Sequence, residues 1–246
     1  MSGLTRLICS GLALLGAPVV LLAAPMAHAQ RGGMNVPEHP VRPVVMELFS
    51  SQNCGNCPAA NENIMLLAER SDVIALTYPV GIWDYLGWDD TFAKREFTDR
   101  QKRYNRVLNY RGPYTPQVVY SGRLHGPGTN LTDIEERFAV RDIAPYPVAV
   151  AIEADSVSVS GDLPSSVTKA GVVAVHFRPG LTQVTPGGGT NKGKAMSYWN
   201  LVTRLEPLGE WTGEARRYPL RCAAGCVVMV QKGGTEGLIL GAAYRK

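Results

Sequence analysis

Four of the five cysteines fall in two close pairs, and these pairs are the side chains best suited to chemistry. Cys54 and Cys57 are separated by two residues, and Cys222 and Cys226 by three. Two thiols at such a spacing can close a disulfide, contribute to a metal site, or exchange electrons with another disulfide through a thiolate. The elements that carry each pair decide between these chemistries.

The first pair stands between a predicted strand and a predicted helix. Residues 44–49 (VVMELF) are a nearly continuous apolar run, which is typical of a strand buried on both faces. Residues 59–70 have helical spacing, and Pro58 fits a helix only in its first turn. A helix N-terminus stabilises a thiolate, which is the nucleophile in disulfide exchange. We expect Cys54 to be the more exposed, attacking sulfur and Cys57, inside the first turn, to be the resolving one.

Two simpler interpretations of Cys54 and Cys57 compete with a redox pair. A purely structural disulfide across so short a loop contributes little to stability. A zinc site needs two more ligands, and the chain has only four histidines. We therefore favour redox chemistry and predict no metal site, although binding of a soft ion such as Cu(I) by the two thiolates stays open as an alternative.

The second pair, Cys222 and Cys226, flanks Ala-Ala-Gly between two apparent strands. A structural disulfide that holds a tight turn is the favoured interpretation in an oxidising compartment. A second redox pair is the alternative. No helix begins after Cys226, which counts against it.

The N-terminus predicts that the protein is exported. Residues 1–29 combine a charged start at Arg6, a short apolar stretch and a small-x-small end, so we expect a signal peptide cut after Ala29. No later segment is apolar and long enough to cross a membrane as a helix. The product would be periplasmic or secreted, where disulfides persist. The net charge of +4 gives no argument for nucleic-acid binding.

The rest of the chain predicts two domains after a linker at 30–41. The first, 42–143, is expected to be α/β, with a second buried strand at 72–80 and with Asp89 and Asp90 capping a helix at 91–108. A closing amphipathic helix is expected at 130–141, with Thr132 or Asn130 as its cap. After the Pro-containing boundary at 144–147, residues 146–246 show only short strands between Gly/Pro turns. This pattern predicts a β-rich antiparallel sandwich or barrel.

The segment VVMELFSSQNCGNCP, followed by a helix, a strand and YTPQVVYSGR, resembles the thioredoxin superfamily over about residues 42–142. The resemblance implies a thioredoxin-like fold for the first domain. It also implies that Pro116 is a cis-proline opposite Cys54 and that the backbone of Thr115 pairs with a bound substrate.

The same resemblance suggests roles for three more residues. Glu47 stands near the place of a buried acid that takes the proton of the resolving cysteine, and an ion pair with a basic group is the alternative. Trp83 and Tyr85 follow the second strand and are expected to form an aromatic shelf for an unfolded polypeptide. Packing in the core is the alternative for these rings.

A closer resemblance is to a secreted bacterial family of unknown function, DUF1223. It rests on the start of the motif at ELFSSQNCGNCP, on the WDYLGWDDTF segment and on the YTPQ turn. It extends into the C-terminal half at a Gly- and Asn-containing turn, 187–193, and at the strand 227–231. The family implies fold and export, and no substrate.

Together these patterns predict an exported thiol–disulfide oxidoreductase that needs no cofactor and whose partners are protein thiols and disulfides or a redox partner protein. Two alternatives remain. One is a soft-metal (copper) binding or delivery module, and the other is an envelope partner-binding protein in which the first domain is only a scaffold.

Overall fold

The computed structural model describes residues 43–140 and 148–245. The predicted signal peptide at 1–29, the linker at 30–41 and the boundary at 144–147 lie outside these residues and stay predictions. In chain order the elements are β1 (Val44–Ser50), α1 (Cys57–Leu67), β2 (Val73–Pro79), the 3₁₀ helix η1 (Asp84–Leu86), α2 (Arg95–Val107), β3 (Gln117–Tyr120), β4 (Leu124–Gly126), α3 (Leu131–Phe138), β5 (Val148–Ile152), β6 (Ser156–Gly161), β7 (Ala170–Val184), β8 (Met196–Trp211), β9 (Arg216–Pro219), β10 (Gly225–Lys232) and β11 (Ile239–Arg245).

One large mixed sheet contains strands from both parts of the chain, in the order β11-β10-β7-β8-β2-β1-β3-β4. β1 and β2 are parallel, whereas β3 runs antiparallel to β1 and β4 antiparallel to β3. Every residue of β1 and β2 is buried, as the continuous apolar runs in the sequence indicate for strands covered on both faces.

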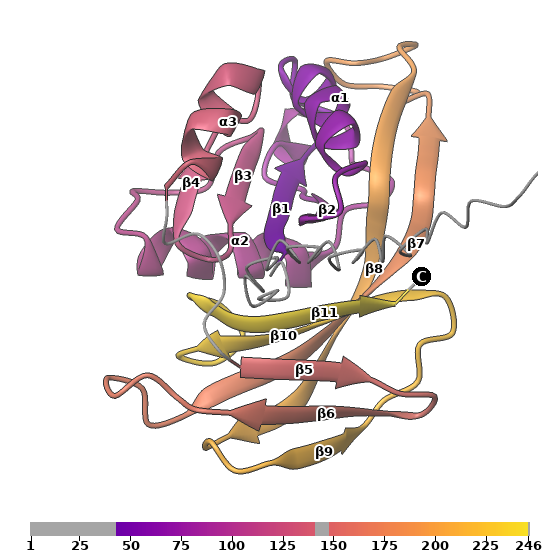
Figure 1. Ribbon diagram of the computed structural model, residues 1–246. Helices are drawn as coiled ribbons and strands as arrows, with labels where there is room; N and C mark the ends of the chain where they lie inside the picture. Colours follow the sequence, from indigo (N-terminus) through magenta and orange to yellow (C-terminus); the bar gives the residue numbers. More distant parts are fainter. Residues whose placement is uncertain (1–42, 141–147, 246) are drawn as a thin grey trace, which may run out of the picture. The chain divides into compact units, whose positions relative to one another are not determined.

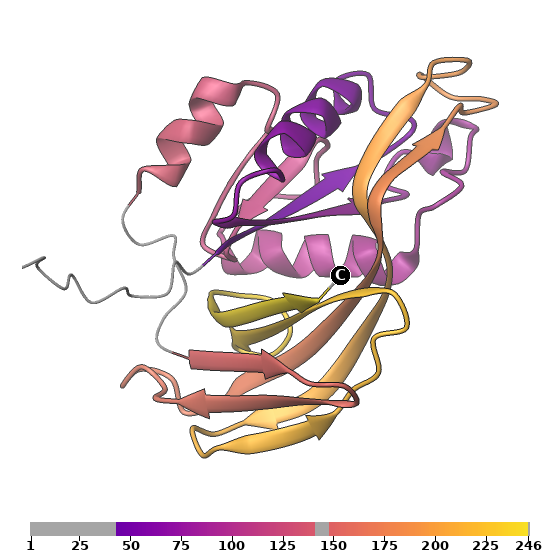
Figure 2. The same cartoon turned by 45° about the vertical axis from the view of Figure 1, so that its right-hand side comes forward.

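The helices cover both faces of the N-terminal part of the sheet (Figures 1 and 2). Met46 and Leu48 of β1 point toward α1 and α3, where they pack in one core with Ile64. The alternate residues Val45 and Phe49 point to the opposite face and α2. Because side chains alternate along a strand, β1 supplies two cores at once.

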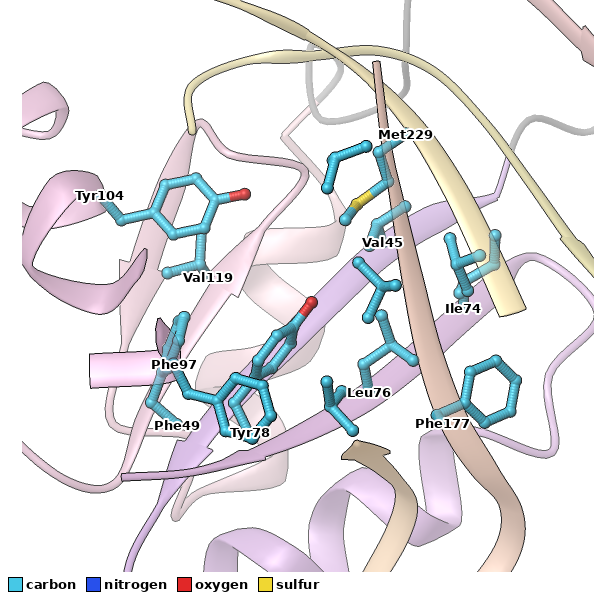
Figure 3. Packing of buried hydrophobic residues seen from close by; sticks show 14 of the residues in the cluster. Val45, Phe49, Ile74, Leu76, Tyr78, Phe97, Tyr104, Val119, Phe177 and Met229 are labelled. Atoms are coloured by element: carbon cyan, nitrogen blue, oxygen red, sulfur yellow. The ribbon is translucent and has the colours of Figure 1, made fainter. Parts of the chain in front are cut away.

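The core on the α2 face continues into the C-terminal half. Figure 3 shows Val45 and Ile74 of the central strands in the same cluster as Phe177 of β7 and Met229 of β10. The two parts of the chain therefore share a continuous apolar core, in addition to a sheet.

The two parts meet where β8 lies parallel to β2, with Thr77 opposite Leu201. The Thr77 hydroxyl donates to the Trp199 carbonyl at 2.8 Å, and the Asn200 amide donates to the Ala75 carbonyl at 2.9 Å. The β2–β8 pairing extends over a short stretch of the two strands, and these side-chain hydrogen bonds add to it.

The prediction of a β-rich C-terminal half is confirmed. A second antiparallel sheet, β5-β6-β9, encloses an apolar core with the antiparallel strands β7, β8 and β10. The sequence did not predict that β8 would extend this part into the sheet of the N-terminal half. β7 and β8 are also longer than expected, at 15 and 16 residues, because they project beyond the core as a hairpin.

The predicted cap of the second helix was wrong. α2 begins at Arg95 with Lys94 at its N-cap, whereas Asp90 accepts hydrogen bonds from the backbone N–H groups of Phe92 and Ala93 in the preceding turn. The predicted cap of α3 is confirmed, since the Asn130 side chain accepts from the N–H groups of Thr132 and Asp133.

A fully buried ion pair joins β1 to α2. Glu47 and Arg100 are both 0% exposed, and the guanidinium binds the carboxylate through Nε at 2.7 Å and Nη2 at 3.0 Å. Tyr104 also donates to Glu47, and Gln231 of β10 accepts from Arg100. Burial and the Glu47 carboxylate raise the pKa of Tyr104 well above its ordinary value, which keeps its hydroxyl a donor. The network therefore ties β1, α2 and β10 together.

Replacing one partner of the Glu47–Arg100 ion pair should lower the free energy of unfolding far more than replacing both partners. We expect Arg100→Met to lower the free energy of unfolding by about 3–5 kcal/mol, because it leaves Glu47 as an uncompensated buried charge. The double variant Glu47→Leu/Arg100→Met should recover most of that loss. Urea unfolding measures both.

Arg70→Met is the matched control, because the ion pair of Arg70 with Asp72 is largely exposed. It should cost less than about 1 kcal/mol. Equal losses for Arg100→Met and Arg70→Met would contradict the assigned importance of the buried network.

Candidate functional site

Cys54 and Cys57 form a disulfide, with Cα atoms 5.3 Å apart, between the end of β1 and the start of α1. Pro58 lies in the first turn of α1, as expected, and no side chain caps this turn. The cysteines therefore lie at a helix N-terminus, whose positive dipole end favours a thiolate after reduction. Cys54 is 6% exposed and Cys57 0%, so only Cys54 borders solvent.

The opening beside Cys54 is a surface cavity of about 260 Å³. Trp83 and Thr115 line it together with Cys54, and the Trp83 indole donates to the Thr115 hydroxyl at 2.7 Å. The Thr115–Pro116 peptide bond is cis, as the resemblance implied. Tyr85 does not line the cavity, but its ring centroid lies 6.2 Å from that of Trp83.

The loop before Cys54 is held by buried polar side chains that sequence reasoning missed. The Asp90 carboxylate accepts from the Gln52 N–H at 2.7 Å, and the Asn53 amide donates to the Trp88 carbonyl at 2.6 Å. The Trp88 indole in turn donates to the Gln52 side chain at 3.1 Å. The sequence signal that could have indicated this network is the polar Ser-Gln-Asn triplet at 51–53, between a buried strand and a cysteine.

The Asp90 side chain that binds this loop is buried, with 5% of the residue exposed. Burial raises its pKa above the ordinary value, an effect that the N–H groups of Gln52 and Phe92 partly offset and that the Asp84 charge increases. Burial, and after it the charge of Asp90, raises the pKa of Tyr198, whose ring packs in the cluster with Cys54 and Cys57.

Glu47, the predicted proton acceptor, makes the ion pair with Arg100 described above. Its hydrogen bonds among the described residues come from Arg100 and Tyr104. An ion pair with a basic group was the alternative interpretation of this residue, so the proton-acceptor role is a prediction that these contacts do not favour.

Cys222 and Cys226 form the second disulfide, with Cα atoms 5.7 Å apart, across the turn that leads into β10. Cys226 is fully buried in the core between the two sheets of the C-terminal half. Within the part of the chain that the structure describes, no three His, Cys, Asp or Glu side chains gather closely enough to hold a metal ion. No helix in that same part is long and apolar enough to span a membrane.

The chain belongs to the family described as "Protein of unknown function (DUF1223)", whose model matches residues 45–231. This match confirms the closer of the two resemblances and includes both cysteine pairs. None of the curated proteins compared with the chain matches it.

Two solved structures are similar to this one. The crystal structure of protein AGR_C_4864 from Agrobacterium tumefaciens is 32% identical over 82% of this chain and 92% of that chain, with a TM-score of 0.67. HBP35 of Porphyromonas gingivalis is 13% identical over 83% of this chain and 74% of that chain, with a TM-score of 0.49.

The raised pKa of Asp90 predicts a pH-dependent contribution to stability. A folded-state pKa above the unfolded value favours the protonated carboxyl in the folded protein, so stability falls as pH rises through that interval. Asp90→Asn removes this titration. We therefore expect the difference in unfolding free energy, wild type minus Asp90→Asn, to decrease as the pH rises from the ordinary pKa of an aspartate through the raised folded-state pKa in urea denaturation.

Asp72 is the contrasting control, because its hydrogen bond with Arg70 lowers its pKa. The corresponding difference for Asp72→Asn should increase with pH over the acidic range. A difference for Asp90→Asn that also increases with pH would contradict the electrostatic description of the loop.

Proposed function

We propose that this protein is an exported thiol–disulfide oxidoreductase that acts on protein thiols and disulfides through Cys54 and Cys57. The observation that carries the proposal is the cavity in which Cys54 and Thr115 share a wall while Cys57 stays buried behind them. The sulfur atom of a partner protein would reach Cys54, whereas Cys57 would stay shielded until exchange begins.

The topology around the cysteines supports a thioredoxin-like N-terminal unit. The strand order is β2-β1-β3-β4, in which β1 and β2 are parallel and β3 runs antiparallel to its neighbours β1 and β4. This arrangement is the one expected of that superfamily. α1 and α3 on one face and α2 on the other also match it (Figure 1). The cis bond at Pro116, directly before β3, is the third point of agreement.

The proposed exchange starts from the disulfide. A substrate thiolate attacks Cys54 Sγ, a mixed disulfide forms, the Cys54–Cys57 bond breaks, and Cys57 leaves as a thiolate. A second substrate thiolate then attacks the substrate sulfur of the mixed disulfide, which releases an oxidised substrate and the reduced pair. Two electrons pass to the pair, and its cysteines take up two protons. The reverse sequence reduces a substrate disulfide, and a redox partner protein restores the starting state.

The walls of the cavity favour an extended polypeptide with an apolar side chain next to its cysteine. The backbone of Thr115 would pair with such a segment. Leu86 lines the cavity and is 58% exposed, and neighbouring Tyr85 is 76% exposed. Contiguous exposed apolar surface marks an interaction site, and we propose that these two adjacent side chains form such a surface beside Cys54. Unfolded or partly folded proteins present such segments.

The proposed site of action is the periplasm or the external medium, after removal of residues 1–29. The chemistry resides in the two sulfur atoms, so no cofactor is required. The oxidising compartment would also maintain the Cys222–Cys226 disulfide, which we propose to be structural, since it holds the turn into β10.

The reduction potential of the Cys54–Cys57 pair tests the proposal. In redox buffers followed by thiol trapping and mass spectrometry, the pair should equilibrate reversibly between about −270 and −120 mV, the interval of known exchange catalysts. The double variant Cys222→Ser/Cys226→Ser should leave that value unchanged, because those residues lie outside the site.

If the Cys54–Cys57 pair stays oxidised at buffer potentials well below this interval, the disulfide is structural and the enzyme proposal is overturned. Stoichiometric uptake of Cu(I) by the reduced pair, without exchange activity, would favour the alternative of a soft-metal module. Normal exchange in a variant with Cys54→Ser would equally contradict the assigned role of the attacking sulfur.

A further inference from the structure

The loop between β7 and β8 reaches across to the disulfide from the C-terminal half. The hairpin lies beside α1 in both views (Figures 1 and 2). Gly188 packs so closely on Trp88 that a Cβ there would overlap the indole ring. A Cβ on Gly55, between the two cysteines, would lie 3.6 Å from the Thr190 methyl group. Residues about 135 positions apart in the sequence are therefore in contact around the redox motif.

Asn191 makes the specific contacts of this loop. Its side chain is 1% exposed, and its amide nitrogen donates to the Cys54 carbonyl at 2.8 Å and to the Gln52 carbonyl at 3.0 Å. Because both partners are carbonyl oxygens, only the NH₂ group can face them. The amide oxygen has no hydrogen-bond partner among the described residues, so these two donor bonds alone fix the orientation of the amide.

The Cys54 carbonyl is a sensitive place for such a bond. The same oxygen accepts from the Cys57 N–H at 3.2 Å, in the turn that separates the two cysteines. Its orientation therefore determines how the Cys54 peptide is placed relative to the start of α1. Asn191 thus holds the motif in the geometry with Cα atoms 5.3 Å apart, in which the two sulfur atoms can bond.

We propose that Asn191 is a positioning residue of the redox site, which favours the Cys54–Cys57 disulfide over the open dithiol by holding the Cys54 carbonyl. The inference deepens the proposed function and rests on it for its biological meaning. It also assigns a role to the C-terminal half, which completes the redox site across the sheet.

The test compares three variants of the mature protein at equilibrium with dithiothreitol. Asn191→Asp replaces the donor by a carboxylate of the same size, and Asn191→Ala removes the group. Asn63→Ala is the matched control for Asn191→Ala, since the Asn63 amide also donates to a backbone carbonyl, that of Gly128 at 3.0 Å, and makes no bond to the motif. Thiol trapping and mass spectrometry quantify each cysteine pair, and circular dichroism verifies folding.

We expect both Asn191 variants to lower the equilibrium constant for the Cys54–Cys57 disulfide by about tenfold, which is a rise of about 30 mV in reduction potential. Asn63→Ala should stay within about twofold of the wild type. The Cys222–Cys226 pair of the same molecules should not change in any variant.

Wild-type values for the Asn191 variants, or an equal shift in Asn63→Ala, would overturn the inference. These outcomes are separate from failure of the proposed function. A wild-type potential outside the interval of exchange catalysts would remove the enzyme proposal, yet the ratio between Asn191 variants and wild type would still decide the role of Asn191.

Discussion

The pairing of β8 with β2 is the constraint on which the rest of the structure depends. It joins the antiparallel strands of the C-terminal half to the parallel strands beside the cysteines, and the Thr77 and Asn200 side chains reinforce it. Since the β7–β8 hairpin continues from this junction, its loop can reach the Cys54–Cys57 motif. Without the pairing, Asn191 would have no fixed position relative to Cys54, and the core shown in Figure 3 would be open on one side.

The buried carboxylates of Glu47 and Asp90 are stabilised in two different ways. Glu47 is fully compensated by Arg100 inside a network that includes Tyr104 and Gln231, and its role is to hold elements together. Within the described part of the chain Asp90 has no cationic partner, and backbone N–H groups of the loop before Cys54 and of the following turn stabilise it. A carboxylate held in this way positions backbone, and its raised pKa makes the loop sensitive to pH.

Local patterns allowed much of the fold and the centre of the site to be predicted. The apolar run of β1, the cysteines at the start of α1 and the Asn130 cap each depend on neighbouring residues. Long-range contacts left no such signal. The family resemblance marked the Gly- and Asn-containing turn at 187–193, but nothing in the sequence places its Asn191 against Cys54, 137 residues away. Asp90 was taken for a helix cap because acidic residues are common before helices. Glu47 needed a basic partner, but only the structure identifies Arg100 among many arginines.

The most direct test of the central claim is trapping of the exchange intermediate with a defined substrate. A mature Cys57→Ser variant retains the attacking thiol but cannot resolve a mixed disulfide, so incubation with insulin should join one insulin chain to Cys54. Mass spectrometry of the tryptic peptides locates the bond, and Cys54→Ser serves as the comparison. The account predicts an adduct on Cys54 that dithiothreitol releases, and little on Cys57 in the comparison variant. Equal adducts in both variants, or none in either, would contradict it.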